Sequence, residues 1–251
     1  MYFPLKNPNL PENRVTVVAV STKASEKLLN KLDEHEITAI KTITNNLVTD
    51  VGYHTDLNLL NYSEGNILID KSQKEIFVNF LTKGYSLKTI SEVKSPYPYD
   101  CRLNCVIMGD KLICNPKTAS DEVLLIANEL DIKIIPVNQG YTKCSICLLN
   151  DNALITDDES IYNACKTNQI ASLLISKGSV KLNGFDYGFI GGCTGLIDKN
   201  KLLFNGDINY HNDCNMIIDF LNSYNIEAVI IDNEPLTDIG SIIPLCEKPN
   251  K

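Results

Sequence analysis

The chain repeats one pattern of hydrophobic and polar positions four times. In each copy, a short apolar run, a tight polar turn and a second apolar run follow one another, which is the pattern of a β-hairpin. Each second run ends on a short polar side chain that can hydrogen-bond its own backbone and turn the chain. The hairpins are predicted at residues 59–70, 106–115, 148–157 and 196–205.

A helix and a third strand are predicted after every hairpin, so the repeated unit is ββαβ. The first of these helices starts at Ser72, which stands three residues before Glu75 at the spacing of a capping box. In the last one, apolar residues recur at helical spacing from Met216 to Tyr224. The helices are predicted at 72–81, 121–130, 159–166 and 209–224, and the strands that follow them at 87–93, 132–137, 170–176 and 226–231.

The two ends of the chain predict a fifth unit in two halves. Residues 15–20, 25–36 and 37–43 give a strand, a helix and a strand, and the missing first strand is predicted at 239–245. Pairing of that strand with 15–20 would close the units into a ring without an open sheet edge. We therefore predict an α/β fold, a five-bladed pseudo-symmetric α/β-propeller closed by its C-terminal strand.

This architecture gives one domain at 14–246, an N-terminal arm at 1–13 that is free to pack on a neighbour, and a polar tail at 247–251. The alternative is a doubly wound or two-domain α/β protein, against which the tight hairpins argue, since they cannot join parallel strands. The repeats are predicted at about 14–44 with 239–245, 54–93, 101–137, 143–176 and 191–231.

Composition narrows the classes of function. The chain has 251 residues, 44% of them hydrophobic, which is enough for a sizeable core. Its apolar runs are far shorter than the ~20 residues of a membrane span, and no signal peptide is recognisable. The net charge of -8 disfavours nucleic acid and favours small cationic ligands. We expect a cytoplasmic protein that binds a small cationic molecule, with no membrane or nucleic-acid partner, and consider a homodimer.

The nine cysteines are odd in number, in a long chain without a recognisable export signal, so a disulfide framework is not expected and a reducing compartment is. One pair, Cys144 and Cys147, has CxxC spacing, but it lies in an apolar strand, where these positions face opposite ways. No second pair is present to complete a zinc site, and the three histidines are scattered. No Gly-rich phosphate loop occurs either. We therefore expect no metal and no cofactor.

Five ββαβ units around an axis are the architecture of the pentein superfamily. The chain resembles its guanidino-group-modifying members, the arginine and agmatine deiminases, dimethylarginine hydrolases and amidinotransferases, and looks most like an uncharacterised clostridial-type family assigned to this fold. The resemblance covers about residues 14–246. Local strings that carry it are Asn138-Gln-Gly-Tyr-Thr-Lys-Cys-Ser145, Gly188-Phe-Ile-Gly-Gly-Cys-Thr-Gly195 and Phe204-Asn-Gly-Asp-Ile208.

The residues before each first strand are predicted to line a central funnel, because that strand lies innermost in such a ring. Three units begin with a glycine and an aromatic residue, at 52–53, 140–141 and 188–189. Counting forward from these glycines and backward from the hairpin turns places Asp56, Cys144 and Gly192 in the funnel. The backward count adds Arg102, and analogy with these units adds Asp238 from the unit that is split between the two ends of the chain. Neighbours of this set are His54, Lys143, Cys193 and Thr194.

The resemblance implies that a cysteine thiolate attacks a guanidinium carbon. The count into the funnel makes Cys144 the candidate nucleophile, with Cys193 as the alternative. Cations such as Lys143, Arg102 or protonated His54 would lower the thiol pKa. His54 would move the proton, and carboxylates would hold the planar cation. The catalytic set is Cys144, His54 and Asp56, and the substrate-binding set is Asp238, Arg102, Lys143, Gly192 and Thr194.

Each of these residues has a structural alternative. The cysteines would be buried hydrophobic residues, the glycines would serve close packing, and Asp56 and Asp238 would cap turns. The resembled enzymes also carry their cysteine on the first strand of the last unit, where this chain has only Cys246, after the predicted strand. Two functions remain open: a cysteine-dependent hydrolase, deiminase or amidinotransferase for a small guanidino compound, or a non-catalytic pentein-fold binding protein.

Overall fold

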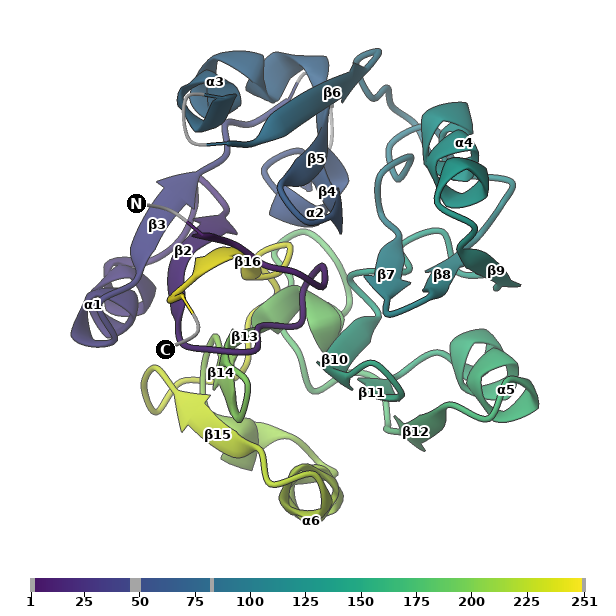
Figure 1. Ribbon diagram of the computed structural model, residues 1–251. Helices are drawn as coiled ribbons and strands as arrows, with labels where there is room; N and C mark the ends of the chain where they lie inside the picture. The colour runs from purple at the N-terminus through teal and green to yellow at the C-terminus, as the bar shows by residue number, and fades with distance from the viewer. Residues whose placement is uncertain (1–2, 46–50, 82–83, 250–251) are drawn as a thin grey trace.

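The computed structural model describes residues 3–45, 51–81 and 84–249. Five small sheets surround a central axis, and a helix lies on the outer side of each (Figure 1). The predicted five-bladed α/β-propeller is therefore confirmed. The strands of the four continuous units are β4 (Leu59–Ser63), β5 (Asn66–Asp70), β6 (Ser86–Ile90), β7 (Val106–Met108), β8 (Lys111–Cys114), β9 (Lys133–Pro136), β10 (Ile146–Asn150), β11 (Ala153–Thr156), β12 (Ala171–Leu174), β13 (Thr194–Asp198), β14 (Lys201–Phe204) and β15 (Glu227–Ile230).

Each continuous unit has the same topology. Its first two strands form an antiparallel hairpin, and the third strand pairs in parallel with the second after the helix. Apolar side chains of neighbouring units pack against one another between the inner hairpins and the outer helices. The helices are α3 (Lys74–Leu81), α4 (Asp121–Glu129), α5 (Glu159–Thr167) and α6 (Cys214–Ser223). Among the described residues, no helix has both the length and the apolar character of a membrane span.

The polar residue at the end of the second strand turns the chain as predicted. In the first unit, the Asp70 carboxylate accepts the backbone N–H of Ser72, at 2.8 Å, and begins the 3-10 turn η1 (Lys71–Gln73). Helix α3 follows this turn, so its start is set by Asp70 and not by the predicted capping box of Ser72 and Glu75. The same carboxylate accepts the N–H of Val93, at 2.7 Å, which ties the end of the unit to its helix start.

The ring closes through β16 (Ile243–Glu247), which pairs antiparallel with β2 (Val15–Val20). Ile243 lies opposite Ala19, and β2 pairs in parallel with β3 (Thr38–Lys41) after α1 (Glu26–Glu34). This strand begins later than the predicted range of 239–245. Cys246 is consequently a buried residue within β16, which corrects the prediction that it follows the strand.

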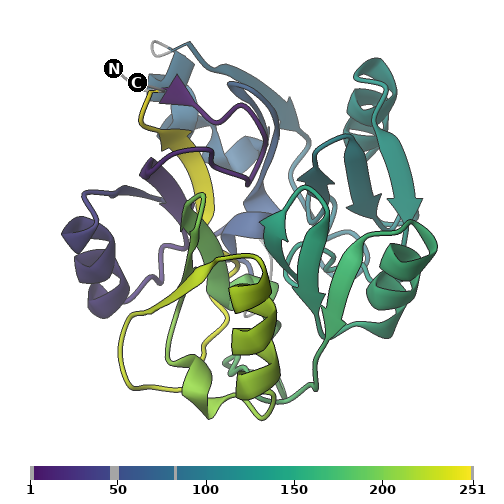
Figure 2. The same ribbon diagram turned by 60° about the horizontal axis from the view of Figure 1, so that its bottom comes forward.

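The N-terminal arm packs on its own chain. Its short strand β1 (Phe3–Pro4) pairs with β16 (Figure 2). The next residue, Leu5, is buried. Further along, the Glu247 carboxylate accepts the backbone N–H groups of Glu12, at 2.7 Å, and Asn13, at 2.8 Å. The arm thus covers the strand that closes the ring.

Closure of the ring can be tested at Gly195 in β13, because a side chain there would overlap the carbonyl oxygen of Ile242, just before β16. We expect Gly195→Ala to lower the free energy of unfolding by about 3 kcal/mol or more, as overpacking against backbone does. Urea unfolding followed by circular dichroism measures the loss. Gly178→Ala is the control, since nothing lies within 4 Å of that position and only its positive φ opposes a side chain. Equal losses in both variants would contradict this packing.

Candidate active site

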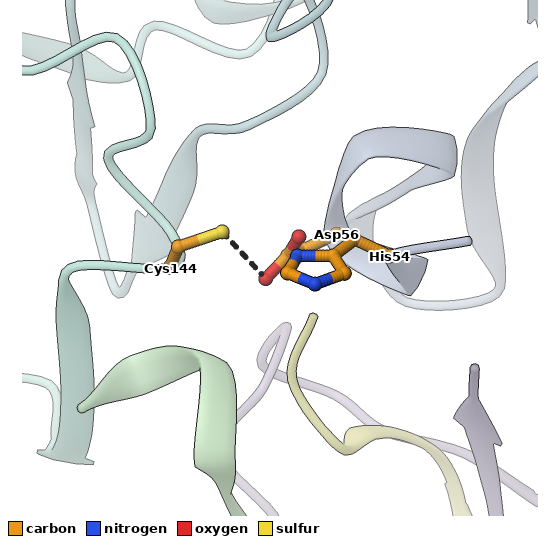
Figure 3. A group of neighbouring side chains, drawn as sticks. All are labelled: His54, Asp56 and Cys144. Carbon is orange, nitrogen blue, oxygen red and sulfur yellow. Dashed lines mark hydrogen bonds between the residues drawn. The ribbon is translucent and has the colours of Figure 1, made fainter. Parts of the chain in front are cut away.

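Side chains from three units meet near the axis of the ring. His54 and Asp56 lie at the start of the short helix α2 (Thr55–Asn58), Cys144 lies two residues before β10, and Asp238 comes from the segment before β16. All four are buried, with exposed fractions of 1–2%. Figure 3 shows His54 and Asp56 on one side and the Cys144 sulfur directed toward them. The fold thus brings together four residues that the sequence predicts for the site.

The Cys144 thiol is held by hydrogen bonds on two sides. Its Sγ donates to Oδ2 of Asp56, at 3.1 Å, and accepts from Nδ2 of Asn104, at 3.3 Å. The Ser241 hydroxyl donates to the same Asp56 oxygen, at 2.6 Å. The second oxygen of Asp56, Oδ1, is buried and has no hydrogen-bond partner in the described part of the chain. The thiol therefore stands beside a carboxylate with unused acceptor capacity.

Asn104 fixes the backbone beneath this thiol. Its Oδ1 accepts the N–H groups of Lys143, at 2.7 Å, and Cys144, at 3.2 Å, while its amide reaches the sulfur. Asn104 occupies the funnel position predicted for Arg102. The guanidinium of Arg102 lies elsewhere, 3.4 Å from the Ser91 hydroxyl and 3.8 Å from Glu122. The structure does not bring Arg102 to the cluster.

Asp238 is fixed by backbone donors on the other side of the cluster. Its oxygens accept the N–H groups of Phe189, at 3.0 Å, and Gly240, at 2.9 Å. Oδ1 of Asp238 also lies 3.7 Å from Nδ1 of His54. A side chain at Gly192 would overlap the Asp238 carboxylate. Gly192, predicted as a substrate-binding residue, therefore makes room for Asp238.

Burial controls the ionisation of this cluster. It raises the pKa of the Cys144 thiol well above its usual value, and the charges of Asp56 and Asp238 raise it further. This corrects the expectation that neighbouring cations lower that pKa. Burial also lowers the pKa of His54 to about 4 and raises the pKa of Asp238 to about 6. At neutral pH the cluster holds a thiol, a neutral imidazole and an ionised Asp238.

Three further predicted residues lie near the cluster without lining its cavity. Nζ of Lys143 donates to the Ser241 hydroxyl, at 3.0 Å, and so reaches Asp56 through that hydroxyl. Sγ of Cys193 donates to the carbonyl of Ile190, at 3.2 Å, within a hydrophobic cluster. The Thr194 hydroxyl also donates to Ile190, at 3.1 Å.

A cavity of about 260 Å³ opens over Cys144, His54 and Asp238. Its walls include a loop that sequence reasoning missed, between β12 and β13, which supplies Leu182, Phe185, Asp186 and Tyr187. Only the glycine and aromatic pair at 188–189 signalled this loop in the sequence. The remaining wall residues are Val51, Tyr141 and Phe189.

The cluster also offers three potential metal ligands. Each of His54, Asp56 and Cys144 offers one ligand atom, and these three atoms lie within 4.8 Å of one another. Imidazole nitrogen, carboxylate oxygen and thiolate sulfur are the ligands that zinc prefers. The sequence predicts no metal, because it contains no second cysteine pair at zinc-ligand spacing. His54 and Asp56 are two residues apart, and only the fold brings Cys144 to them.

Comparison with solved structures shows that several enzymes share the fold of this chain. An agmatine deiminase from C. jejuni superposes with a TM-score of 0.56 at 12% identity, over 100% of this chain and 98% of that one. An inosamine-phosphate amidinotransferase from Streptomyces griseus gives 0.62 at 8% identity, over 98% of both chains. DDAH from Pseudomonas aeruginosa gives 0.53 at 9% identity, over 87% and 92%. At these identities the likeness carries the fold alone.

The chain itself belongs to the family of unknown function DUF6873, whose model matches residues 19–243. Among curated proteins, no sequence matches it.

Proposed function

We propose that this protein is a cysteine-dependent enzyme that acts on the guanidinium group of a small cationic molecule, as a hydrolase, deiminase or amidinotransferase. The observation that carries the proposal is the convergence of the Cys144 thiol, the His54 imidazole and the Asp238 carboxylate at one cavity, with Asp56 bonded to the thiol. The solved structures of similar fold include deiminases and amidinotransferases, which agrees with this class of chemistry. The reduced thiol that it needs fits the cytoplasm expected from the sequence.

Substrate binding itself would prepare the nucleophile. The two carboxylates that raise the pKa of Cys144 are the groups that attract a guanidinium. A bound cation offsets their charge and lowers the thiol pKa by the same electrostatic effect. The buried Nε2 of His54, which has no partner among the described residues, accepts the thiol proton. The thiolate therefore forms only when a cation is present.

The chemistry then proceeds in two stages. The thiolate sulfur forms a bond to the guanidinium carbon, and the imidazolium of His54 gives its proton to the departing nitrogen as the C–N bond breaks. In hydrolysis, the neutral imidazole takes a proton from water, whose oxygen bonds to the same carbon. The C–S bond breaks, and the proton returns to the sulfur. In group transfer, an amine takes the place of water.

A matched pair of alkylating reagents tests this arrangement. We expect cationic 2-chloroacetamidine to alkylate Cys144 at least about tenfold faster than neutral 2-chloroacetamide, because only the cation is drawn to the carboxylates and lowers the thiol pKa. Peptide mass spectrometry at several times and pH values gives the rate at each cysteine. Cys193, which lies outside the cavity, serves as the internal control. Equal rates for the two reagents, or labelling elsewhere, would point instead to a non-catalytic binding protein.

A further inference from the structure

Two cysteines face each other across the hairpin of the second continuous unit. Its strands β7 and β8 pair antiparallel, with Val106 opposite Ile113 (Figure 1). The same register, extended by one residue, places Cys105 opposite Cys114. Opposite residues of such a pair point to the same side, with Cα atoms about 4.5–5.5 Å apart, which is within the range of about 4.4–6.8 Å that a disulfide requires. Both cysteines are free thiols.

The two thiols interact directly in the interior of the protein. Both belong to one hydrophobic cluster, and their exposed fractions are 3% for Cys105 and 0% for Cys114. The hydrogen bond from Cys105 lowers the pKa of Cys114, whereas the same bond, together with burial, raises the pKa of Cys105. Burial raises the thiol pKa of Cys144 and Cys193 as well. Since oxidants attack the thiolate, Cys114 is the member of the pair that an oxidant attacks first.

The pair is joined to the central cluster through Asn104, the residue before Cys105. Nδ2 of Asn104 donates to Sγ of Cys144, at 3.3 Å, and its Oδ1 accepts the backbone N–H of Cys144, at 3.2 Å. The backbone here is tightly turned. The N–H of Asn104 donates to the carbonyl of Cys101, at 3.0 Å, and the N–H of Cys105 to that of Leu103, at 2.8 Å. A displacement of Cys105 therefore also displaces Asn104.

We propose that Cys105 and Cys114 form an oxidative modification site, at which a hydroperoxide produces a reversible disulfide that displaces Asn104 from Cys144. With hydrogen peroxide, the Cys114 sulfur bonds to one oxygen, the O–O bond breaks, and the other oxygen leaves as water. The Cys105 sulfur then bonds to the Cys114 sulfur, the S–O bond breaks, and the second oxygen leaves as water. The two thiols lose two electrons and two protons, which the peroxide gains. A thiol reductant reverses the reaction by exchange.

The disulfide would change the surroundings of Cys144. It brings two sulfur atoms to about 2.05 Å, closer than any hydrogen-bonded contact, so the start of β7 and the end of β8 must approach each other. Asn104 moves with the start of β7. Burial and the charges of Asp56 and Asp238 raise the pKa of Cys144, and the hydrogen bond from Asn104 acts in the opposite direction. Loss of that bond leaves Cys144 less reactive.

Peptide mapping tests the disulfide in the folded, full-length protein. Trypsin cleaves after Lys111, so a disulfide between the two cysteines links the separate peptides 103–111 and 112–117. The protein is treated with hydrogen peroxide, its remaining thiols are blocked with N-ethylmaleimide in denaturant, and the digest is analysed without reductant. We expect these two peptides to form the first cross-link, and dithiothreitol to separate them. Absence of this cross-link, or pairing of Cys105 with Cys101, would overturn the proposal.

A serine variant tests the order of the two steps. In Cys105→Ser the hydroxyl can still donate to Cys114, but no second sulfur is present, so dimedone should trap a sulfenic acid at Cys114. Labelling of another cysteine in place of Cys114 would refute its role as the attacking thiol. Cys165→Ser is the matched control, because it removes a buried cysteine of the outer helix α5. The cross-link should form in this variant as in the unmodified protein.

The link to the central cluster has its own readout, the rate at which 2-chloroacetamidine alkylates Cys144. We expect peroxide treatment to lower this rate about twofold to tenfold, the effect of one hydrogen bond of ordinary strength, and dithiothreitol to restore it. The same treatment should leave the rate unchanged in Cys105→Ser. An equal fall in both proteins would assign the effect to oxidation of Cys144 itself and refute the link through Asn104. No step requires turnover, so failure of the proposed function would leave this modification site standing.

Discussion

Cys144→Ser is expected to lower kcat on a guanidino substrate by more than about 1000-fold, because the serine hydroxyl does not ionise to a comparable nucleophile. The fold should persist, since the hydroxyl can still donate to Asp56 as the thiol does. The rate of product formation at saturating substrate gives kcat, and urea unfolding gives the stability of the variant. Loss of activity with unchanged stability is the expected combination.

Cys193→Ser provides the matched control for this substitution. Cys193 is as deeply buried as Cys144, and its thiol donates to a backbone carbonyl within a hydrophobic cluster. We expect this variant to keep kcat within a few-fold of the unmodified protein, with a modest loss of stability. The opposite pattern, with Cys193→Ser inactive and Cys144→Ser active, would identify Cys193 as the nucleophile and refute the assignment of Cys144 that was made from the cavity.

Asp238→Asn is expected to weaken binding of a guanidinium ligand by about 30-fold to several thousand-fold, the effect of removing one partner of a buried charge pair. The carboxylate is fully buried at the floor of the cavity, where little water screens it. Calorimetry in the Cys144→Ser background measures the affinity.

The pH dependence of binding adds a second signature of Asp238. Because the pKa of Asp238 is about 6, the carboxyl becomes protonated as pH falls, and affinity should drop about tenfold between pH 7 and pH 5.

Asp157→Asn is the control for a buried carboxylate outside the cavity. Burial raises the pKa of Asp157 to about 7, but its side chain is not part of the cavity wall. We expect this variant to bind the ligand normally and to keep the pH dependence, whereas Asp238→Asn should lose it. His54 stays largely neutral in this pH range, since burial lowers its pKa to about 4. A pH dependence that survives in Asp238→Asn would assign it to another group.

The fold could be predicted because each unit has its own local signals. Tight turns between apolar runs define hairpins, and a polar residue such as Asp70 ends the hairpin and starts a helix. In the third continuous unit the helix is capped by Asp158, one residue after the predicted Asp157. The position of β16 was harder to predict. Residues 239–242 are apolar enough to suggest a strand, but their backbone bonds to Gly192 and Thr194 of the neighbouring unit, and the strand itself begins at Ile243.

The central cluster was predicted in the units whose hairpins share one irregularity, with a count one residue longer in the first unit than in the other two. The first, third and fourth continuous units carry a register shift just before the turn, and there the count from the turn reaches Asp56, Cys144 and Gly192. The second unit lacks that shift, and its strand β7 has only three residues. Counting from Lys111 therefore goes two residues too far, to Arg102, and misses Asn104.

Electrostatics could not be predicted at all from residue types. Lys143 is adjacent to Cys144 in the sequence, which suggests a lowered thiol pKa, yet its ammonium bonds to Ser241 and the thiol instead faces Asp56. The direction of the pKa change depends on burial and on which side chains share a cavity. Both depend on contacts between units that are far apart in the chain.

The way in which the ring closes determines when the site comes into existence during synthesis. Asp238 and Ser241 belong to the segment that leads into β16, whereas His54, Asp56 and Cys144 are made much earlier. Since chains fold progressively from the N-terminus as they emerge from the ribosome, a nascent chain that ends before this segment has the thiol with Asp56 and Asn104 but lacks the Asp238 carboxylate of the cavity. We therefore expect the cavity to be complete only after β16 has paired with β2.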